Sequence, residues 1–484
     1  MSAPVPDERA ALERLGTAAV ERALRAGAAQ AEAVLAGSRS LSVRVHGGLV
    51  ESVKQSAPRG LGLRVLVDGA QGFVTGTDLD PGSLDDLARH AVALARFSTP
   101  DEANAFPTPE EATGDEPELG LVDPAVPALA PERAIAMALE LERVALGVDP
   151  RLRRTDGAGV SRHEGWSVLV NSHGLVRRGH ATTVSAGVSP LADDGAGKQQ
   201  SGWYGMVKCG LDQLESVEAI AREAARRALA RLGARPVPTA RVPVILAPDI
   251  AAAWIGDLFD AFSGESRLKR TTWLAAEVGT DIASPLVTLV DDGRLPRAVG
   301  SSTHDGEGIP TRRNVLIERG RFTTVLYDHY HARRAGTRST GSAVRGYAST
   351  PAIGPSNLFV AAGGDRPEAI LARVERGFYM DDQGAYGFNS TTGDYSYQAQ
   401  GFWVEKGERV FPVEGVTVAA NSRDMLRNVV AVGDDLVFLG STASPTLLIA
   451  EMTVSGSRRW ASCARPPAAW ASSARTTSGW SRSP

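Results

Sequence analysis

Cysteine is scarce in this sequence, and long apolar runs are missing from it. The two cysteines, Cys209 and Cys463, are too few for a disulfide framework or a cysteine-rich metal site. No run of about 20 apolar residues occurs, so no transmembrane helix is expected. Residues 1–30 contain acidic side chains and no apolar segment, which argues against a signal peptide. We therefore expect a cytoplasmic protein that does not act at a membrane.

Charge is distributed unevenly along the 484 residues, which carry a formal net charge of −4. The segment 457–484 contains arginines and no acidic residue, so the rest of the chain is more acidic than the total indicates. A mildly acidic body does not favour binding to a phosphate backbone, and no nucleic-acid partner is expected. The length allows two or three domains, each with its own core.

The first half of the chain shows the patterns of helices and antiparallel strands. Apolar residues at helical spacing predict helices over 7–28, 81–97, 131–146 and 214–232. Alternating patterns, with hairpin signals at Gly47-Gly48 and Asp68-Gly69, predict strands over 31–45, 49–53, 60–74 and 154–188. The overall class is thus α+β. We predict an N-terminal α+β region over 1–235, with helices on antiparallel sheet and a possible division into two subdomains near 99–127.

Short apolar runs separated by turn residues dominate the second half. A strand over 242–246 and a helix over 250–262 open it, and the aromatic residues of that helix are predicted to lie in the core. From residue 286 onward almost all elements are predicted to be strands, apart from helices near 367–376 and 423–428. This predicts a largely antiparallel β domain over 240–456, whose sheet must curve or close to protect its edges. The segment 457–484 has no helical or strand period and is predicted to be disordered and dispensable.

Several marks in the second half resemble the TldD/PmbA peptidases, the modulator of DNA gyrase family. They are Asp305, Glu307-Gly308, the run 314–320, Tyr330 with Ala332 and Gly336, Gly393-Asp394, and the run 432–436. The resemblance extends over residues 10–456 and is densest after Val242. It implies a role in proteolysis or peptide processing, in which paired subunits enclose a chamber that admits unfolded or small peptides.

The resemblance also implies where zinc would be bound. In metal-binding members of the family, the helix after the first strand of this domain carries His-Glu-x-x-x-His, and a cysteine follows late in the domain. Here the helix 249–262 contains no histidine, and no cysteine lies between Gly210 and Ser462. The chain therefore resembles the TldE (PmbA) type, the partner subunit that lacks the zinc motif. We expect no catalytic residue, metal or other cofactor in this chain, and zinc in a TldD-like partner; without that partner a homodimer is possible.

Gly393, Asp394 and Tyr395 are the candidate residues for a peptide-binding cleft. The turn at Gly393-Asp394 would present a carboxylate and an aromatic ring together, and Tyr397 would share a strand face with Tyr395. The alternative that Asp394 caps its own turn stays open.

Other constellations of polar residues fit a catalytic site less well. His163-Glu164 with His173 lacks the helical spacing of a metalloprotease motif, and we interpret these as exposed polar residues near a hairpin. On a strand, the histidines of Asp328-His329-Tyr330-His331 would share a face, but no third ligand is evident. Asp381-Asp382 is interpreted as part of a solvated turn. No Gly-x-Ser-x-Gly elbow, phosphate loop or dinucleotide-binding loop occurs.

Two hypotheses from different classes follow. The chain is either a metal-free subunit of a heteromeric metallopeptidase, or a self-sufficient hydrolase with His329, His331 or Asp394 in catalysis. A non-enzymatic peptide-binding protein is a third reading. A neighbouring reading frame that encodes a chain with His-Glu-x-x-x-His would favour the first hypothesis, and isolated activity that is insensitive to chelators would favour the second.

Overall fold

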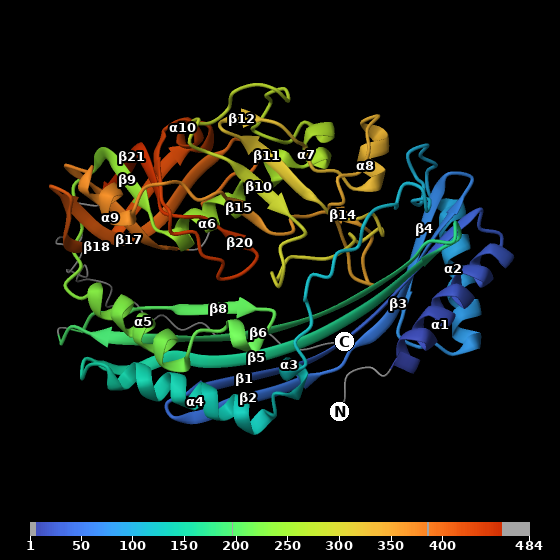
Figure 1. The fold of residues 1–484 in the computed structure, drawn as a ribbon, viewed down its shortest axis with the longest axis horizontal. Coiled ribbons are helices and arrows are strands. Elements are labelled where there is room, and N and C mark those ends of the chain that lie inside the picture. The colour runs from blue at the N-terminus through green and yellow to red at the C-terminus, as the bar shows by residue number, and fades with distance from the viewer. Residues whose placement is uncertain (1–5, 196, 385–386, 457–484) are drawn as a thin grey trace, which may run out of the picture.

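Two long antiparallel strands, β5 (Leu152–Asn171) and β6 (Val176–Asp193), form the centre of the first half of the chain (Figure 1). The structure is a computed structural model that describes residues 6–195, 197–384 and 387–456. The predicted tail 457–484 lies outside these residues. The predicted α+β class is confirmed, because helices lie against mostly antiparallel sheets throughout the described chain.

The first sheet has eight strands in the order β4-β3-β1-β5-β6-β7, with β2 paired to β1 and β8 paired to β6. The strands are β1 (Gln30–His46), β2 (Leu49–Ser56), β3 (Arg59–Val67), β4 (Ala70–Gly76), β5 (Leu152–Asn171), β6 (Val176–Asp193), β7 (Gln199–Ser201) and β8 (Tyr204–Lys208). The hairpin predicted at Asp68-Gly69 is present, and both residues have the positive φ that such a turn requires.

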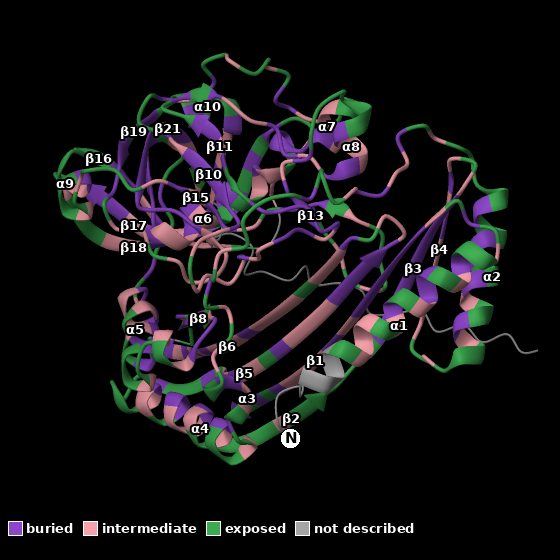
Figure 2. Ribbon diagram, turned by 45° about the vertical axis from the view of Figure 1, so that its right-hand side comes forward, coloured by how far each residue is buried: buried purple, intermediate pink, exposed green. Residues whose placement is uncertain are grey.

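Helices cover one face of this sheet and leave the other face toward the second half of the chain (Figure 1). They are α1 (Pro6–Arg25), α2 (Pro81–Phe97), α3 (Ala125–Ala128), α4 (Pro131–Gly147) and α5 (Val217–Ala230), with a 3-10 turn at Leu211–Gln213. Along β6, Val184, Ala186 and Val188 are buried beneath α4 and α5, whereas Ser185 and Gly187 between them remain half-exposed. This alternation, visible as bands along the long strands in Figure 2, follows from the two-residue period of a strand.

The second half contains a closed sheet. Its strands follow the order β18-β17-β16-β9-β21-β19, and a further pairing of β18 with β21 closes the ring. They are β9 (Ala240–Leu246), β16 (Arg376–Gln383), β17 (Asp394–Glu405), β18 (Glu408–Asn421), β19 (Val429–Val432) and β21 (Leu447–Gly456). The prediction was that the sheet must curve or close to protect its edges, and the structure shows that it closes.

A smaller sheet and short helices complete the second half. The sheet has the order β12-β11-β10-β15-β20, and β13 pairs with β14 alone. These strands are β10 (Leu289–Asp292), β11 (Arg313–Glu318), β12 (Arg321–Phe322), β13 (Ala343–Val344), β14 (Ala352–Ile353), β15 (Leu358–Val360) and β20 (Thr442–Ala443). The helices are α6 (Pro248–Asp257), α7 (Gly264–Lys269), α8 (His329–Arg334), α9 (Pro367–Ala372) and α10 (Ser422–Arg427), with a 3-10 turn at Phe259–Phe262.

Aromatic side chains form much of the core of the second half. Trp254, Phe262 and Phe378 are fully buried there, and Phe259 packs against the same core from a half-buried position. The prediction of a core role for the aromatic residues of α6 and its extension is thus confirmed. Among the residues that the structure describes, no helix has the length and apolar character that crossing a membrane requires.

Candidate functional site

Helix α6 is the element on which the resemblance places zinc ligands in metal-binding relatives. Its buried residues are Ile250, Ala251, Trp254 and Ile255. Its carboxylates are already engaged: Asp249 accepts from Arg227 Nη1 at 2.6 Å, and Asp257 accepts from the hydroxyl of Tyr397 at 2.9 Å. Within residues 6–195, 197–384 and 387–456, no three His, Cys, Asp or Glu side chains gather as a metal would require. The donor set on α6 therefore does not fit a zinc site.

The turn at Gly393 lies on the surface of the closed sheet. Gly393 has a φ of 78°, and Asp394 accepts hydrogen bonds from the Thr392 hydroxyl at 2.7 Å and from Asn421 Nδ2 at 2.9 Å. These bonds hold the pKa of Asp394 below its ordinary value. The Tyr395 side chain instead lies in the core, where its hydroxyl donates to Gln383 Oε1 at 2.9 Å. The structure does not bring this carboxylate and this ring to the same surface, and their role in a cleft remains a prediction.

The polar residues at 163–164 differ from the sequence interpretation. Glu164 lies within β5 and is fully buried, with its Oε1 3.0 Å from His180 Nε2 on β6. The interpretation as exposed residues near a hairpin was wrong for Glu164, because its strand position faces the helix-covered side of the sheet. His163 faces the opposite side, and partial burial lowers its pKa. The two neighbours cannot converge on one ligand.

The segment 328–331 forms the start of helix α8 and not a strand. Asp328 caps this helix by accepting the backbone N–H of His331 at 2.7 Å, and it also binds His331 Nδ1 at 2.8 Å. His329 is buried, with its Nε2 3.4 Å from Glu111 Oε1. The prediction that the two histidines would share a strand face was wrong, because the N-cap carboxylate favours a helix over an extended chain.

Asp381 and Asp382 belong to strand β16 and not to a solvated turn. Arg231, at the end of α5, donates through Nη1 to Asp382 Oδ2 at 2.6 Å and through Nη2 to the backbone carbonyl of Asp381 at 3.0 Å. Burial raises the pKa of Asp381, and Arg231 opposes that rise. The solvated-turn interpretation was wrong, and this pair joins the two halves of the chain.

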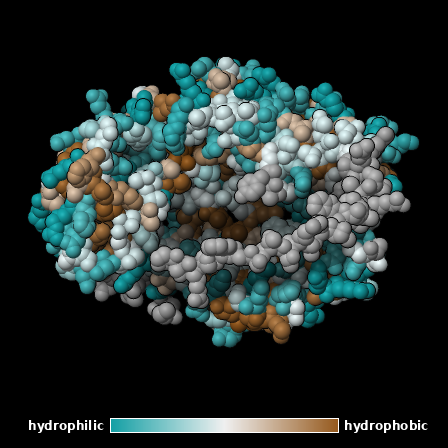
Figure 3. Space-filling view, turned by 180° about the vertical axis from the view of Figure 1, so that it is seen from behind, coloured by the Kyte–Doolittle hydropathy of each residue, from teal (hydrophilic) through white to brown (hydrophobic). Residues whose placement is uncertain are grey.

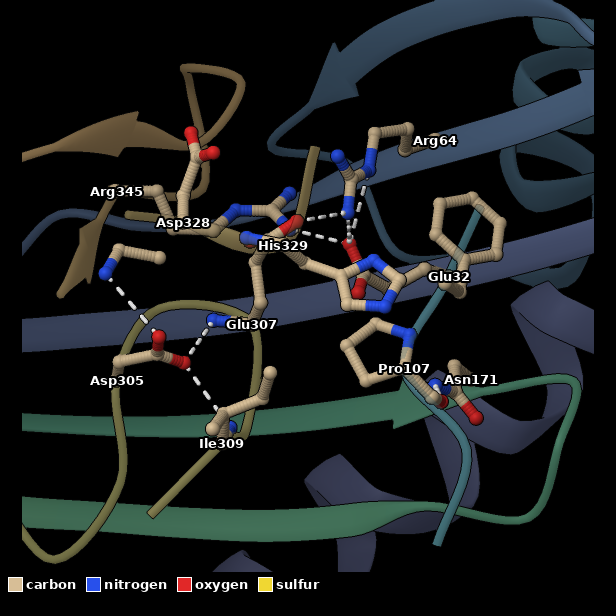
Figure 4. Close-up of polar contacts among 12 residues, drawn as sticks. Glu32, Arg64, Pro107, Asn171, Asp305, Glu307, Ile309, Asp328, His329 and Arg345 are labelled. Atoms are coloured by element: carbon tan, nitrogen blue, oxygen red, sulfur yellow. Dashed lines mark hydrogen bonds and ion pairs between the residues drawn. The ribbon is translucent and has the colours of Figure 1, made fainter. Parts of the chain in front are cut away.

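A buried network of four charges also joins the two halves (Figure 4). Arg64 on β3 donates through Nε to Glu32 Oε1 at 3.1 Å and through Nη2 to Glu307 Oε1 at 3.2 Å. Arg345 donates to the same Glu32 oxygen. All four side chains are at most 5% exposed. Burial alone would raise the pKa of Glu32, but Arg64 and Arg345 outweigh it and hold that pKa below its ordinary value.

Asp305 shapes the loop that carries Glu307 into this network. Its Oδ1 accepts the backbone N–H groups of Glu307 at 2.9 Å and Ile309 at 3.0 Å, and its Oδ2 accepts that of Ala343 at 3.1 Å. Glu307 also accepts the backbone N–H of His329 at 2.8 Å. The family marks at 305 and 307 thus fix loops of the second half onto the first sheet. No pattern in the sequence identified Glu32, Arg64 or Arg345 as their partners.

The uncovered face of the first sheet lines a cleft toward the second half. Cross-strand rows of mostly small and hydroxyl side chains, with one histidine, form this face: Ser42 with Ser161 and Ser185, Ser40 with His163 and Thr183, Ser38 with Gly165 and Ala181, and Ala36 with Ser167 and Gly179. A cavity of about 820 Å³ lies over one end of these rows, closed by Ser301–Thr303 and Tyr347, and a second of about 750 Å³ lies over the other. Figure 3 shows a hollow in the middle of the molecule. The signal in the sequence was the alternation of serine at 38, 40 and 42.

The arrangement in this cleft suits an extended polypeptide better than a compact ligand. Its floor is long, and its many short side chains leave room for a backbone and offer hydroxyl donors and acceptors. Ser42 and Ser161 already lie at hydrogen-bonding distance, 3.0 Å between hydroxyl oxygens. We therefore take this cleft, bounded by the rows defined above, as the candidate functional site.

Comparison with known proteins identifies relatives over almost the whole described chain. Residues 31–95, 124–232 and 239–456 match domain 1, the central domain and the C-terminal domain of the PmbA/TldA metallopeptidases. Metalloprotease PmbA of Escherichia coli O157:H7 is 31% identical over 426 residues, which cover 88% of this chain and 92% of the relative. A metalloprotease TldD homolog of Haemophilus influenzae is 26% identical over 440 residues, which cover 85% of this chain and 89% of the relative.

Solved structures show the same fold. A Bacteroides thetaiotaomicron protein named as a modulator of DNA gyrase has a TM-score of 0.84 and 25% identity, covering 92% of this chain and 98% of its own. TldE from Thermococcus kodakarensis has a TM-score of 0.82 and 24% identity, covering 90% of this chain and 99% of its own. The second likeness is one of fold.

Proposed function

The chain belongs to the PmbA/TldA metallopeptidase family, and from this premise we propose that it is the metal-free subunit of a two-chain peptidase that acts on unfolded or small peptides. The observation that carries the proposal is that helix α6 offers no side chains suited to binding zinc. Apolar side chains fill its buried face, and its two carboxylates, Asp249 and Asp257, are held by Arg227 and Tyr397. A TldD-like partner supplies the zinc and the activated water.

This chain contributes the binding surface. The cleft over the hydroxyl rows accepts an extended peptide, whose backbone N–H and C=O groups exchange hydrogen bonds with serine and threonine hydroxyls. Contacts to backbone tolerate varied side chains, as the degradation of many peptides requires. That PmbA and TldD homologs both occur in Haemophilus influenzae supports a pairing of two related chains.

Reconstitution tests the proposal. The purified chain is assayed alone, then with a TldD-like chain from the same organism, for hydrolysis of an unfolded peptide and for zinc content. We expect peptidase activity only in the mixture, and we expect a chelator to abolish that activity. Zinc should be present in stoichiometric amount in the partner and absent from this chain. The two chains should co-purify through an interface of about 2,000 Å² or more, as permanent complexes do. A partner that is fully active alone and does not co-purify would refute the proposal.

A further inference from the structure

A third cavity lies apart from the cleft, between α5 and the N-terminal end of α6. Its volume is about 450 Å³, within the range of about 300–1,000 Å³ that small-molecule sites commonly enclose. Both halves of the chain contribute to its walls: Trp203 and Arg227 from the first half, and Asp249, Tyr379, Arg409 and Asp435 from the second.

The charges in this cavity fall into two groups. Asp249 is paired with Arg227 at 2.6 Å, and Asp381 with Arg231 at 3.3 Å, so these acids are neutralised within the protein. Arg226 also lines the cavity and is paired with Glu223 at 2.7 Å, whereas Glu215 accepts the neutral hydroxyl of Tyr204 at 2.8 Å. Among the described residues that line the cavity, Arg409 is therefore the arginine without an ion pair, and Asp435 and Glu215 are acids without one.

Arg409 lies flat on an aromatic ring and keeps its donors free. Its guanidinium carbon is 3.5 Å from the centroid of the Tyr379 ring. Among the described residues, the guanidinium group of Arg409 has neither a hydrogen-bond partner nor an ion-pair partner. Stacking fixes the plane of the guanidinium and leaves its edge available to a carboxylate. An unused, oriented arginine at a cavity wall is a recognition element for an anion.

Asp435 offers the opposite charge in the same cavity. Its oxygens accept from the backbone N–H of Thr446 at 2.9 Å and from the Thr446 hydroxyl at 2.7 Å, which are neutral donors, so no cation balances it within the described chain. The pKa of Tyr379 is raised chiefly by burial, Arg409 opposes the rise, and Asp435 adds to it. Both charges therefore act on one phenol and lie within reach of one small molecule.

We propose that this cavity binds a small zwitterion, a free amino acid or dipeptide, with its carboxylate on Arg409 and its ammonium group on Asp435. The exposed faces of Trp203 and Val437 receive the ligand's apolar side chains. The proposal goes beyond the peptidase function, since it concerns a ligand of the isolated chain and needs neither metal nor partner. Binding to this chain and activity of the reconstituted pair are therefore separate measurements.

Isothermal titration calorimetry of the full chain with leucyl-leucine tests this proposal. We expect saturable 1:1 binding, and at least tenfold weaker binding of both N-acetyl-leucyl-leucine and leucyl-leucine amide, which each lack one charge. Each tenfold loss corresponds to about 1.4 kcal/mol. The variant Arg409→Gln should lose affinity for leucyl-leucine by the same factor and should no longer distinguish it from the amide.

Arg376→Gln is the matched control, because Arg376 also stacks on a ring of the same domain, that of Trp403 at 5.3 Å, but lies outside the cavity. It should bind like the unaltered chain. No saturable binding up to about 10 mM, equal affinity for the dipeptide and its amide, or unchanged affinity in Arg409→Gln would each overturn the proposal. The blocked ligands test it on the unaltered protein, so a variant that misfolds does not decide the outcome.

Discussion

Replacing Glu32 by glutamine should be among the most destabilising single substitutions in this chain. Glutamine keeps the size of the side chain and an oxygen acceptor, but it removes the charge that Arg64 and Arg345 share. Two guanidinium groups would then be buried with Glu307 as their one remaining carboxylate in the network. Breaking a buried ion pair by removing one partner costs about 3–5 kcal/mol, and we expect a loss of this size in the free energy of unfolding.

Urea denaturation at neutral pH measures this loss, with a surface pair as the matched control. Glu218 and Arg222 form an exposed i,i+4 pair on α5, so Glu218→Gln should cost at most about 0.5 kcal/mol. The double variant Glu32→Gln with Arg345→Met should regain much of the lost stability, because it restores the charge balance and fills the site with an apolar side chain. A cost for Glu32→Gln no larger than that of Glu218→Gln would refute the reasoning.

The pH dependence gives a second test of the same substitution. The folded-state pKa of Glu32 lies below its ordinary value of 4.5. A lowered pKa contributes stability that is present above pH 4.5 and is lost as the pH falls through the folded-state value. The difference in unfolding free energy between the original chain and Glu32→Gln should therefore be constant near neutrality and shrink in acid. A difference that grows in acid would contradict this account.

Three further predictions concern other sites. Burial, with Asp292 beside it, raises the pKa of Asp291 to about 7, so the contribution of Asp291 to the unfolding free energy should fall by up to about 1.4 kcal/mol per pH unit between pH 4 and 7. Urea titrations should therefore find that the unfolding free energy of the original chain falls more steeply with pH in this range than that of Asp291→Asn, by up to this amount; equal slopes would contradict the assignment. A Cβ at Gly72 would lie 2.0 Å from the Ala91 carbonyl oxygen on α2, so Gly72→Ala should lower the unfolding free energy by about 1–3 kcal/mol, whereas Gly82→Ala, with nothing within 4 Å, should not. Tyr397→Phe should lower the unfolding free energy by about 0.5–1.5 kcal/mol, because it removes the hydrogen bond to Asp257. It should leave the zinc content of the purified chain unchanged, and a larger zinc content would contradict the conclusion that α6 does not bind zinc.

Local chemistry predicted most of the elements. The helix α2 was expected over 81–97 and occupies Pro81–Phe97, because a proline at its first position and apolar residues at helical spacing act within the segment itself. The hairpin at Asp68-Gly69 was equally local. The error at 328–331 has a local cause too: alternation of histidines indicated a strand, while the capping carboxylate of Asp328 starts a helix.

The residues that join the two halves could not be predicted in this way. Arg64 and Glu307 are 243 positions apart, and Glu32 and Arg345 are 313 apart. A charged residue on a strand is usually solvated, so nothing near Glu32 distinguishes it from a surface acid. The burial of Glu164 was missed for the same reason. Family resemblance drew attention to Asp305 and Glu307 without indicating what they hold, and the structure supplies that reason.

The buried network and the candidate cleft are linked through one loop. Arg345 binds Glu32, and Tyr347, two residues further, closes one end of the cleft. This loop lies so close to β3 that a Cβ at Gly62 would be 2.1 Å from the Tyr347 carbonyl oxygen. The ion pair and the close packing therefore both hold this loop against the first sheet at that end of the cleft. Loss of the Glu32 charge should accordingly weaken the peptide binding that we propose for this cleft, as well as the stability of the chain.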